Sequence, residues 1–100
     1  MDRFCLFVAA PAAVEERLVD VLLDAAGGEE FVSGPAFGHG AAPQSLSPAD
    51  QVTGRSALVH VQLLVTEPAL NDLLQRLRSE FRGAGLRYWA TPLAAQGRIE

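Results

Sequence analysis

The chain has 100 residues, of which 49% are hydrophobic, and its eight arginines, lack of lysine and twelve acidic residues give a formal net charge of −4. This length is typical of one domain, here residues 1–100, and the acidic balance argues against a general nucleic-acid binder. The lone cysteine excludes an internal disulfide, and Cys5, His39 and His60 do not have the spacing of a zinc site.

The longest segment without charge runs from Phe4 to Val14 and has eleven residues. A membrane span needs about 20 residues, so we expect no direct membrane insertion. The segment weakly resembles the core of a signal peptide, but Asp2 cancels the charge of Arg3 where such a peptide is positive. We therefore expect a cytoplasmic protein.

The first quarter of the chain predicts a strand and then a helix. The apolar run Phe4–Val8 is typical of a strand that is buried on both faces or nearly so. After Pro11, apolar residues recur every three or four positions up to a stop at Gly27-Gly28, which predicts an amphipathic helix. Its expected buried stripe consists of Val14, Leu18, Val21, Leu22 and Ala25.

A weaker strand and an unusually long connection follow. The segment 31–37 reads as a strand at a sheet edge, because Pro35 cannot donate to a central ladder. Residues 38–55 are rich in Gly, Pro, Ser and Ala, and this connection is far longer than the usual 4 to 6 residues. Such a segment is either a functional loop that orders on binding or a passive insertion.

The second half predicts strand, helix and strand. Apolar residues alternate from Ser56 to Val65, which indicates a long strand with one apolar and one mixed face. Thr66 should begin a helix in which Asp72 and Arg76 form an i, i+4 pair, and residues 86–91 form the last strand. The stripe expected on this helix is Leu70, Leu73, Leu74, Leu77 and Phe81.

The order strand, helix, strand, strand, helix, strand predicts an α+β ferredoxin-like βαββαβ sandwich. In this fold two helices cover one face of a four-stranded antiparallel sheet. The other face would carry Leu58, Leu64 and either Cys5 or Phe7. An apolar face of this kind usually marks an interface, so we expect an oligomer.

Two binding modules of similar fold lack their characteristic residues here. An RNA-recognition module stacks bases on aromatic side chains, and the strand at 55–65 has none. An amino-acid-binding regulatory module would need glycine contacts between the first strand and helix, where the chain reads Ala-Ala-Pro-Ala-Ala at 9–13. We rank this module last.

The long connection contains residue types that could act in catalysis. His39, Ser45, Ser47 and Asp50 offer a nucleophile and a base. No nucleophile elbow, phosphate loop or metalloprotease spacing accompanies them, so we expect no catalytic residues and no enzyme.

Cys5 and His60 are the candidate metal ligands. The first and third strands are neighbours in the expected fold, and Leu6 and Val8 would face the helices, which leaves Cys5 and His60 on the opposite face. A thiolate and an imidazole could hold copper or zinc, especially if an oligomer joined several copies. The alternative is that Cys5 acts as a small buried hydrophobe and that His60 bonds to a neighbour.

The segment Gly34-Pro-Ala-Phe-Gly38-His39-Gly40, with the long connection and alternating strand after it, resembles the PII signal-transduction proteins. The combination of CLFVAAPAAVEERLVDVLL, FGHG, QVTGR and GLRYWATPL resembles a small proteobacterial family of PII-like proteins of unknown function, often encoded beside heavy-metal efflux pumps. The CutA-like cation-tolerance proteins share this architecture.

The PII resemblance implies a homotrimer with ligand pockets between subunits. It also makes residues 38–55 a T-loop that reports ligand state to a partner, such as a membrane transporter or a regulatory protein. PII proteins hold ATP phosphates near the Gly-x-x-x-Gly-His segment, which corresponds to Gly34, Gly38, His39 and Gly40. Their second phosphate element needs a lysine that this chain lacks, so the resemblance does not identify an adenine nucleotide as the effector.

Arg87 and Arg98 are candidates for the missing positive charge, because arginine binds phosphate through two hydrogen bonds. Two functional hypotheses result. The first is a non-catalytic PII-like trimer that binds a small effector and a partner, with a heavy-metal efflux system as the regulated process. The second is a small copper- or zinc-binding protein that uses Cys5, His60 or His39.

Overall fold

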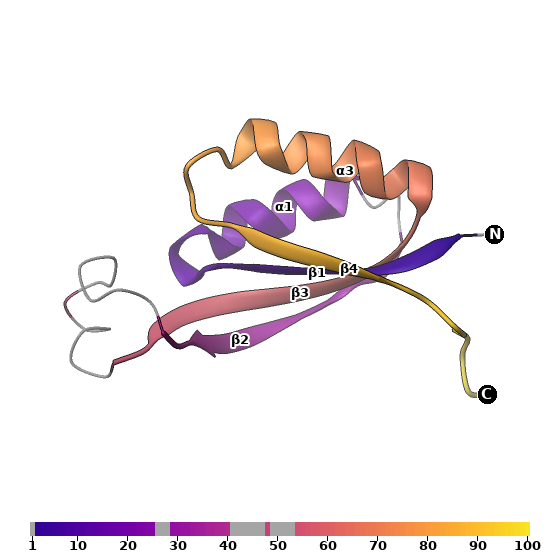
Figure 1. Ribbon diagram of the computed structural model, residues 1–100, viewed down its shortest axis with the longest axis horizontal. Helices are drawn as coiled ribbons and strands as arrows, with labels where there is room; N and C mark the ends of the chain where they lie inside the picture. Colours follow the sequence, from indigo (N-terminus) through magenta and orange to yellow (C-terminus); the bar gives the residue numbers. More distant parts are fainter. Residues whose placement is uncertain (1, 26–28, 41–47, 49–53) are drawn as a thin grey trace.

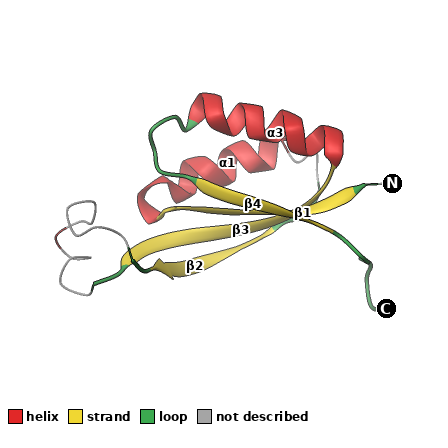
Figure 2. Ribbon diagram, in the orientation of Figure 1, coloured by secondary structure: helices red, strands yellow, loops and turns green. Residues whose placement is uncertain are grey.

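The computed structural model describes residues 2–25, 29–40, 48 and 54–100. Two helices lie on one face of a four-stranded antiparallel sheet with strand order β2-β3-β1-β4, which confirms the predicted ferredoxin-like α+β fold (Figures 1 and 2). The elements are β1 Arg3–Pro11, a 3-10 turn Ala12–Val14, α1 Glu15–Ala25, β2 Val32–Gly38, β3 Ser56–Thr66, α3 Glu67–Glu80 and β4 Arg87–Pro92.

The two central strands place alternate residues in the core. On β1, Leu6, Val8 and Ala10 are buried, while Phe7 and Ala9 between them are half-buried, as a strand with a period of two requires. On β3, Val59, Val61 and Leu63 form the matching row. The prediction that Leu6 and Val8 face the helices is confirmed.

The helices complete the core with the stripes that the sequence predicts, except at the ends of α1. Val14 lies half-buried in the 3-10 turn and Ala25 is exposed, so the buried stripe of α1 is shorter than expected. The core consists of Leu6, Val8, Ala10, Leu18, Val21, Leu22, Val59, Val61, Leu63, Leu70, Leu73, Leu74, Leu77 and Phe81. Among the described residues, the helices are too short or too polar to cross a bilayer.

The start and end of α3 follow from local hydrogen bonds. Thr66 Oγ1 accepts a hydrogen bond from the Ala69 N–H at 3.4 Å, and Pro68 stands in the first turn, so the helix begins where the sequence predicts. At the other end the Phe81 N–H donates to the Leu77 carbonyl at 2.9 Å. Gly83 then turns the chain with a φ of 76°, a conformation that favours glycine.

The predicted Asp72–Arg76 pair is wrong, because the Arg76 guanidinium turns to other carboxylates. Its Nε lies 2.6 Å from Glu80 Oε2 and its Nη1 lies 2.7 Å from Asp24 Oδ2. These hydrogen bonds, the one to Glu80 first, raise the pKa of Arg76. The contact with Asp24 links the end of α1 to α3.

β2 is an edge strand that pairs with β3 alone, as Pro35 predicts. It ends at Gly38, which pairs with Ser56 at the start of β3. Most of the predicted T-loop at 38–55 lies outside the described residues. Its described ends are residues 38–40 and 54–55.

Leu22 and Leu23 provide a test of the one-sided core within α1, because Leu22 is 0% exposed and Leu23 is 60% exposed. Leu22→Ala should lower the free energy of unfolding by about 2–5 kcal/mol, since it removes buried contacts and leaves a cavity. Leu23→Ala should change it by less than about 0.5 kcal/mol. Urea unfolding followed by circular dichroism measures both values, and equal losses would contradict this packing.

Candidate functional site

One face of the sheet lies opposite the helices (Figure 1) and is here called the open face. It carries a stack of three rings from neighbouring strands. The ring of Phe7 on β1 lies 4.4 Å from that of Trp89 on β4 and 5.6 Å from that of His60 on β3, with interplanar angles of 14° and 12°. Phe7 and Trp89 are direct cross-strand partners, and such pairs stabilise a sheet.

His60 has an unused hydrogen-bonding atom. Its Nδ1 is buried and has no hydrogen-bond partner among the described residues. The other ring nitrogen, Nε2, lies over Gly34 of β2, where an added Cβ would approach it to 3.2 Å. A buried polar atom without a partner costs about 1–3 kcal/mol, so a ligand or a second chain that reached Nδ1 would recover this free energy.

The strand register brings together Gly34, His60 and Arg87, three predicted site residues from separate segments of the sequence. Ala9 pairs with His60 on one side and with Arg87 on the other, and His60 pairs with Gly34. Arg87, Ala9, His60 and Gly34 therefore form one row across all four strands on the open face. The row places the Arg87 cation on the same face as the His60 imidazole, whose Nε2 lies over Gly34, and these two nitrogen donors suit a small anion.

Cys5 shares the open face with His60, as expected, but the two residues do not meet within one chain. Cys5 pairs with Leu64, four residues along β3 from His60, which corresponds to about 13 Å. The described residues contain no group of three or more His, Cys, Asp or Glu arranged to hold a metal ion. The predicted metal site stays a prediction and requires more than one copy of the chain.

The base of the long connection is built around Gly38. A Cβ there would lie 2.5 Å from Ser56 Oγ and 3.0 Å from Leu58 Cδ1, so the close approach of β3 favours glycine. Beside it, the Arg55 guanidinium lies 3.9 Å from the centre of the Phe37 ring. This contact has no signal in the sequence, because it depends on the pairing of β2 and β3.

His39 and Gly40 continue from this base. His39 is exposed, and Gly40 has a φ of 84° with nothing near the position of a Cβ. Arg98 lies elsewhere: it lines a shallow hollow with Arg3 and Glu29, near the chain end that Figure 1 shows far from the end of β2 and the start of β3. Within one chain, Arg98 does not join the other predicted site residues.

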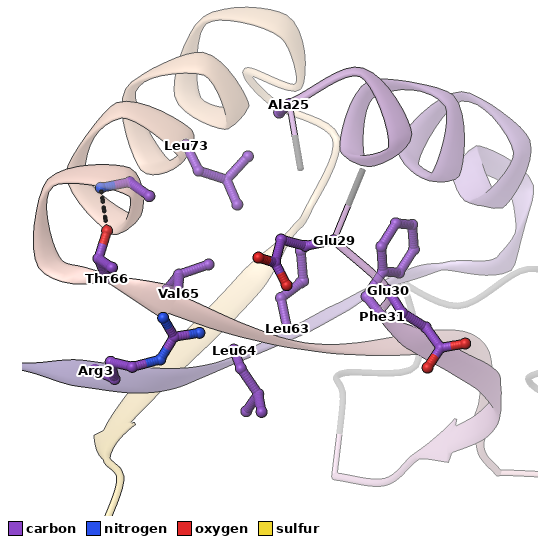
Figure 3. Close-up of a pocket in the computed structure, with 11 residues that line it drawn as sticks. Arg3, Ala25, Glu29, Glu30, Phe31, Leu63, Leu64, Val65, Thr66 and Leu73 are labelled. Carbon is purple, nitrogen blue, oxygen red and sulfur yellow. Dashed lines mark hydrogen bonds between the residues drawn. The ribbon is translucent and has the colours of Figure 1, made fainter. Parts of the chain in front are cut away.

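Two further hollows were not predicted from the sequence. One, of about 370 Å³, lies between α3 and β4 and is lined by Leu77, Phe81 and Tyr88 with Arg78 and Arg82 among its other residues. The other is a cavity of about 150 Å³ that Arg3 and Glu29 line together with apolar residues (Figure 3). The first hollow forms mostly between the consecutive elements α3 and β4, with Val8 of β1 as the one distant contributor, and the second forms where distant segments meet.

Comparison with known proteins assigns the chain to a family. The family model described as "Protein of unknown function (DUF3240)" matches residues 1–100. The chain belongs to the DUF3240 family. No curated protein matches it.

Solved structures share the fold of this DUF3240 chain. A DUF3240 family protein from Shewanella baltica has a TM-score of 0.78 and 17% identity, over 98% of this chain and 97% of that one. CPII from Thiomonas intermedia, a nitrogen regulatory PII-like protein bound to ADP, AMP and bicarbonate, has a TM-score of 0.73 and 18% identity, over 99% and 98%. CutA from Synechococcus elongatus has a TM-score of 0.67 and 17% identity, over 92% and 77%. The predicted PII-like architecture is confirmed.

Proposed function

We propose that this DUF3240 chain is a non-catalytic, trimeric PII-like signalling protein that binds a small anionic effector on the open face. In this proposal residues 38–55 contact a partner, a transporter or regulatory protein of a heavy-metal efflux system. The observation that carries the proposal is the open face itself, which joins uncovered apolar side chains to the row of Arg87, His60 and Gly34.

The apolar side chains on the open face support assembly. Val32, Leu64 and Trp89 come from three strands and are 58%, 40% and 48% exposed. The register places all three on the face that the helices leave uncovered, together with half-buried Phe7. Apolar surface of this kind on a small domain is a common site of association between copies. A trimer also matches the PII resemblance.

The row beside these side chains supports an anionic effector. Arg87 can donate two hydrogen bonds to a carboxylate or phosphate, and His60 Nδ1 has no partner among the described residues. The bicarbonate and nucleotides bound by CPII are small anions, and they are reasonable first probes for a chain of the same fold.

Trp89→Glu should convert the trimer into a monomer, because it places a charge within the aromatic stack of the open face. Leu23→Glu is the matched control, since Leu23 is also a large exposed apolar residue but lies on the helix layer. Size-exclusion chromatography with light scattering gives the mass of each species. A monomeric wild type, or a Trp89→Glu variant of unchanged mass, would contradict the proposed assembly.

The effector should raise the melting temperature of the wild type, since a ligand present at 100 times its Kd stabilises the folded state by about 2.7 kcal/mol. A thermal-shift series with ADP, AMP and bicarbonate measures this effect. Arg87→Gln should remove most of the shift, while Arg82→Gln, on the turn after α3, should retain it. The proposal is wrong if no anion raises the melting temperature of the wild type, or if the melting temperature of Arg87→Gln rises as much as that of the wild type.

The unpartnered His60 Nδ1 also favours a second candidate function, the binding of copper or zinc. The imidazole and the half-buried Cys5 thiol share the open face, and copies that meet through this face would bring several such groups together. Nitrogen and thiolate ligands suit both metals.

Isothermal titration with Cu²⁺ and Zn²⁺ tests this second candidate. Cys5→Ser and His60→Gln should each weaken binding by about tenfold or more, because each removes one ligand. His39→Gln distinguishes this site from one that uses His39, and it should leave the affinity unchanged if Cys5 and His60 are the ligands. Unchanged metal affinity in Cys5→Ser would rule out the site as described.

A further inference from the structure

We propose that the cavity between Arg3 and Glu29 binds a free zwitterionic α-amino acid with an aliphatic or phenyl side chain. The cavity lies at the end of the sheet away from Gly38 and the long connection. It is also remote from residues 9–13, the segment in which an amino-acid-binding regulatory module of similar fold would need its glycine contacts. The proposal therefore adds a ligand site to the function proposed above and does not depend on it.

The cavity exists because β2 is shorter than β3. β2 begins at Val32, which pairs with Gln62, so the last part of β3, Leu63–Thr66, has no strand neighbour on that side. Phe31, Ala69 and Leu73 are among the residues that surround this free edge and enclose about 150 Å³. A free strand edge presents backbone N–H and C=O groups that a ligand can bind.

Two opposite charges face each other across the cavity without forming a pair. Figure 3 shows the Arg3 guanidinium on one side and the Glu29 carboxylate directed toward it from the other, with Leu73 on α3 beside the space between them. No ion pair joins Arg3 and Glu29 within the described part of the chain. The Nε of Arg3 is buried and has no hydrogen-bond partner there.

A zwitterion satisfies both charges, whereas a simple anion or cation would leave one of them unpaired. The carboxylate of the amino acid would accept hydrogen bonds from the Arg3 guanidinium, and its ammonium group would pair with Glu29. Its apolar side chain would enter the space lined by Leu63, Val65 and Leu73.

The volume limits the ligand to a small molecule. A cavity of about 150 Å³ admits a benzene-sized group, and sites for drug-sized ligands are usually about 300–1,000 Å³. Valine, leucine, methionine and phenylalanine therefore fit the dimensions, while tryptophan exceeds them. Thr66 also lines the cavity, but its hydroxyl already accepts a hydrogen bond from the Ala69 N–H. Apart from Thr66 and the charged residues Arg3, Glu29 and Glu30, the lining is apolar, which disfavours polar side chains.

Isothermal titration of the full chain with valine, leucine, methionine and phenylalanine tests the proposal, with two leucine analogues as probes. Leucinamide lacks the carboxylate, and 4-methylpentanoate lacks the ammonium group. At least one amino acid should bind with a Kd in the millimolar range or below, and the analogues of leucine should bind at least about tenfold more weakly than leucine.

Substitutions locate the site. Arg3→Gln and Glu29→Gln should each weaken amino-acid binding by about tenfold or more. Ala69→Leu should abolish binding by filling the cavity from the exposed face of α3. Glu67→Gln is the matched control, because Glu67 is an exposed acidic residue in the first turn of α3 and is not among the residues that line the cavity. Circular dichroism and urea unfolding establish that each variant is folded.

Three results would overturn the proposal. These are a folded wild type that binds none of the four amino acids, equal affinity for leucine and leucinamide, and Glu29→Gln binding like the wild type. Binding of a leucine-containing tripeptide in preference to leucine would also overturn it and would assign the free edge of β3 to a peptide. Each of these results can be obtained whether or not the chain forms a trimer, so this proposal and the trimer are tested by separate measurements.

Discussion

The structure depends on a core that lies on one face of the sheet only. Leu6 and Val8 are buried under the two helices, and the alternation of a strand then forces Phe7 and Cys5 to the opposite face. Burial on one side therefore creates the uncovered surface on the other. The ring stack around Phe7 partly shields this surface, and its remaining exposure is the physical reason to expect a further layer from another chain.

The unequal lengths of the strands make the two ends of the sheet different. β2 and β3 run together to Gly38 and Ser56, where glycine allows the strands to approach closely at the base of the long connection. At the opposite end β3 extends past the start of β2, and the cavity at this end is lined by the charged residues Arg3 and Glu29 among others. The connection that we propose to contact a partner thus begins at one end of the sheet, and the cavity that we propose to bind an amino acid lies at the other.

The features that could be predicted from the sequence are those that depend on the regular spacing of apolar residues within one strand or helix. A period of two assigned Leu6 and Val8 to the core, and a period of 3.6 assigned the stripe on α3. Arg76 shows where this reasoning stops, because its partner Asp24 comes from another helix and a local i, i+4 rule cannot find it. The cavity at Arg3 was missed for the same reason, since it depends on where β2 begins.

Leu64 connects the two proposed sites. It lies on the open face, where it is 40% exposed, and it also lines the cavity beside Arg3. In the proposed trimer a second chain would pack against Leu64 and restrict its side chain. Any amino acid whose binding changes the position of Leu64 must then change the free energy of assembly, and assembly must change amino-acid affinity by the same factor. The coupling would arise from one shared side chain and would need no change in the rest of the sheet.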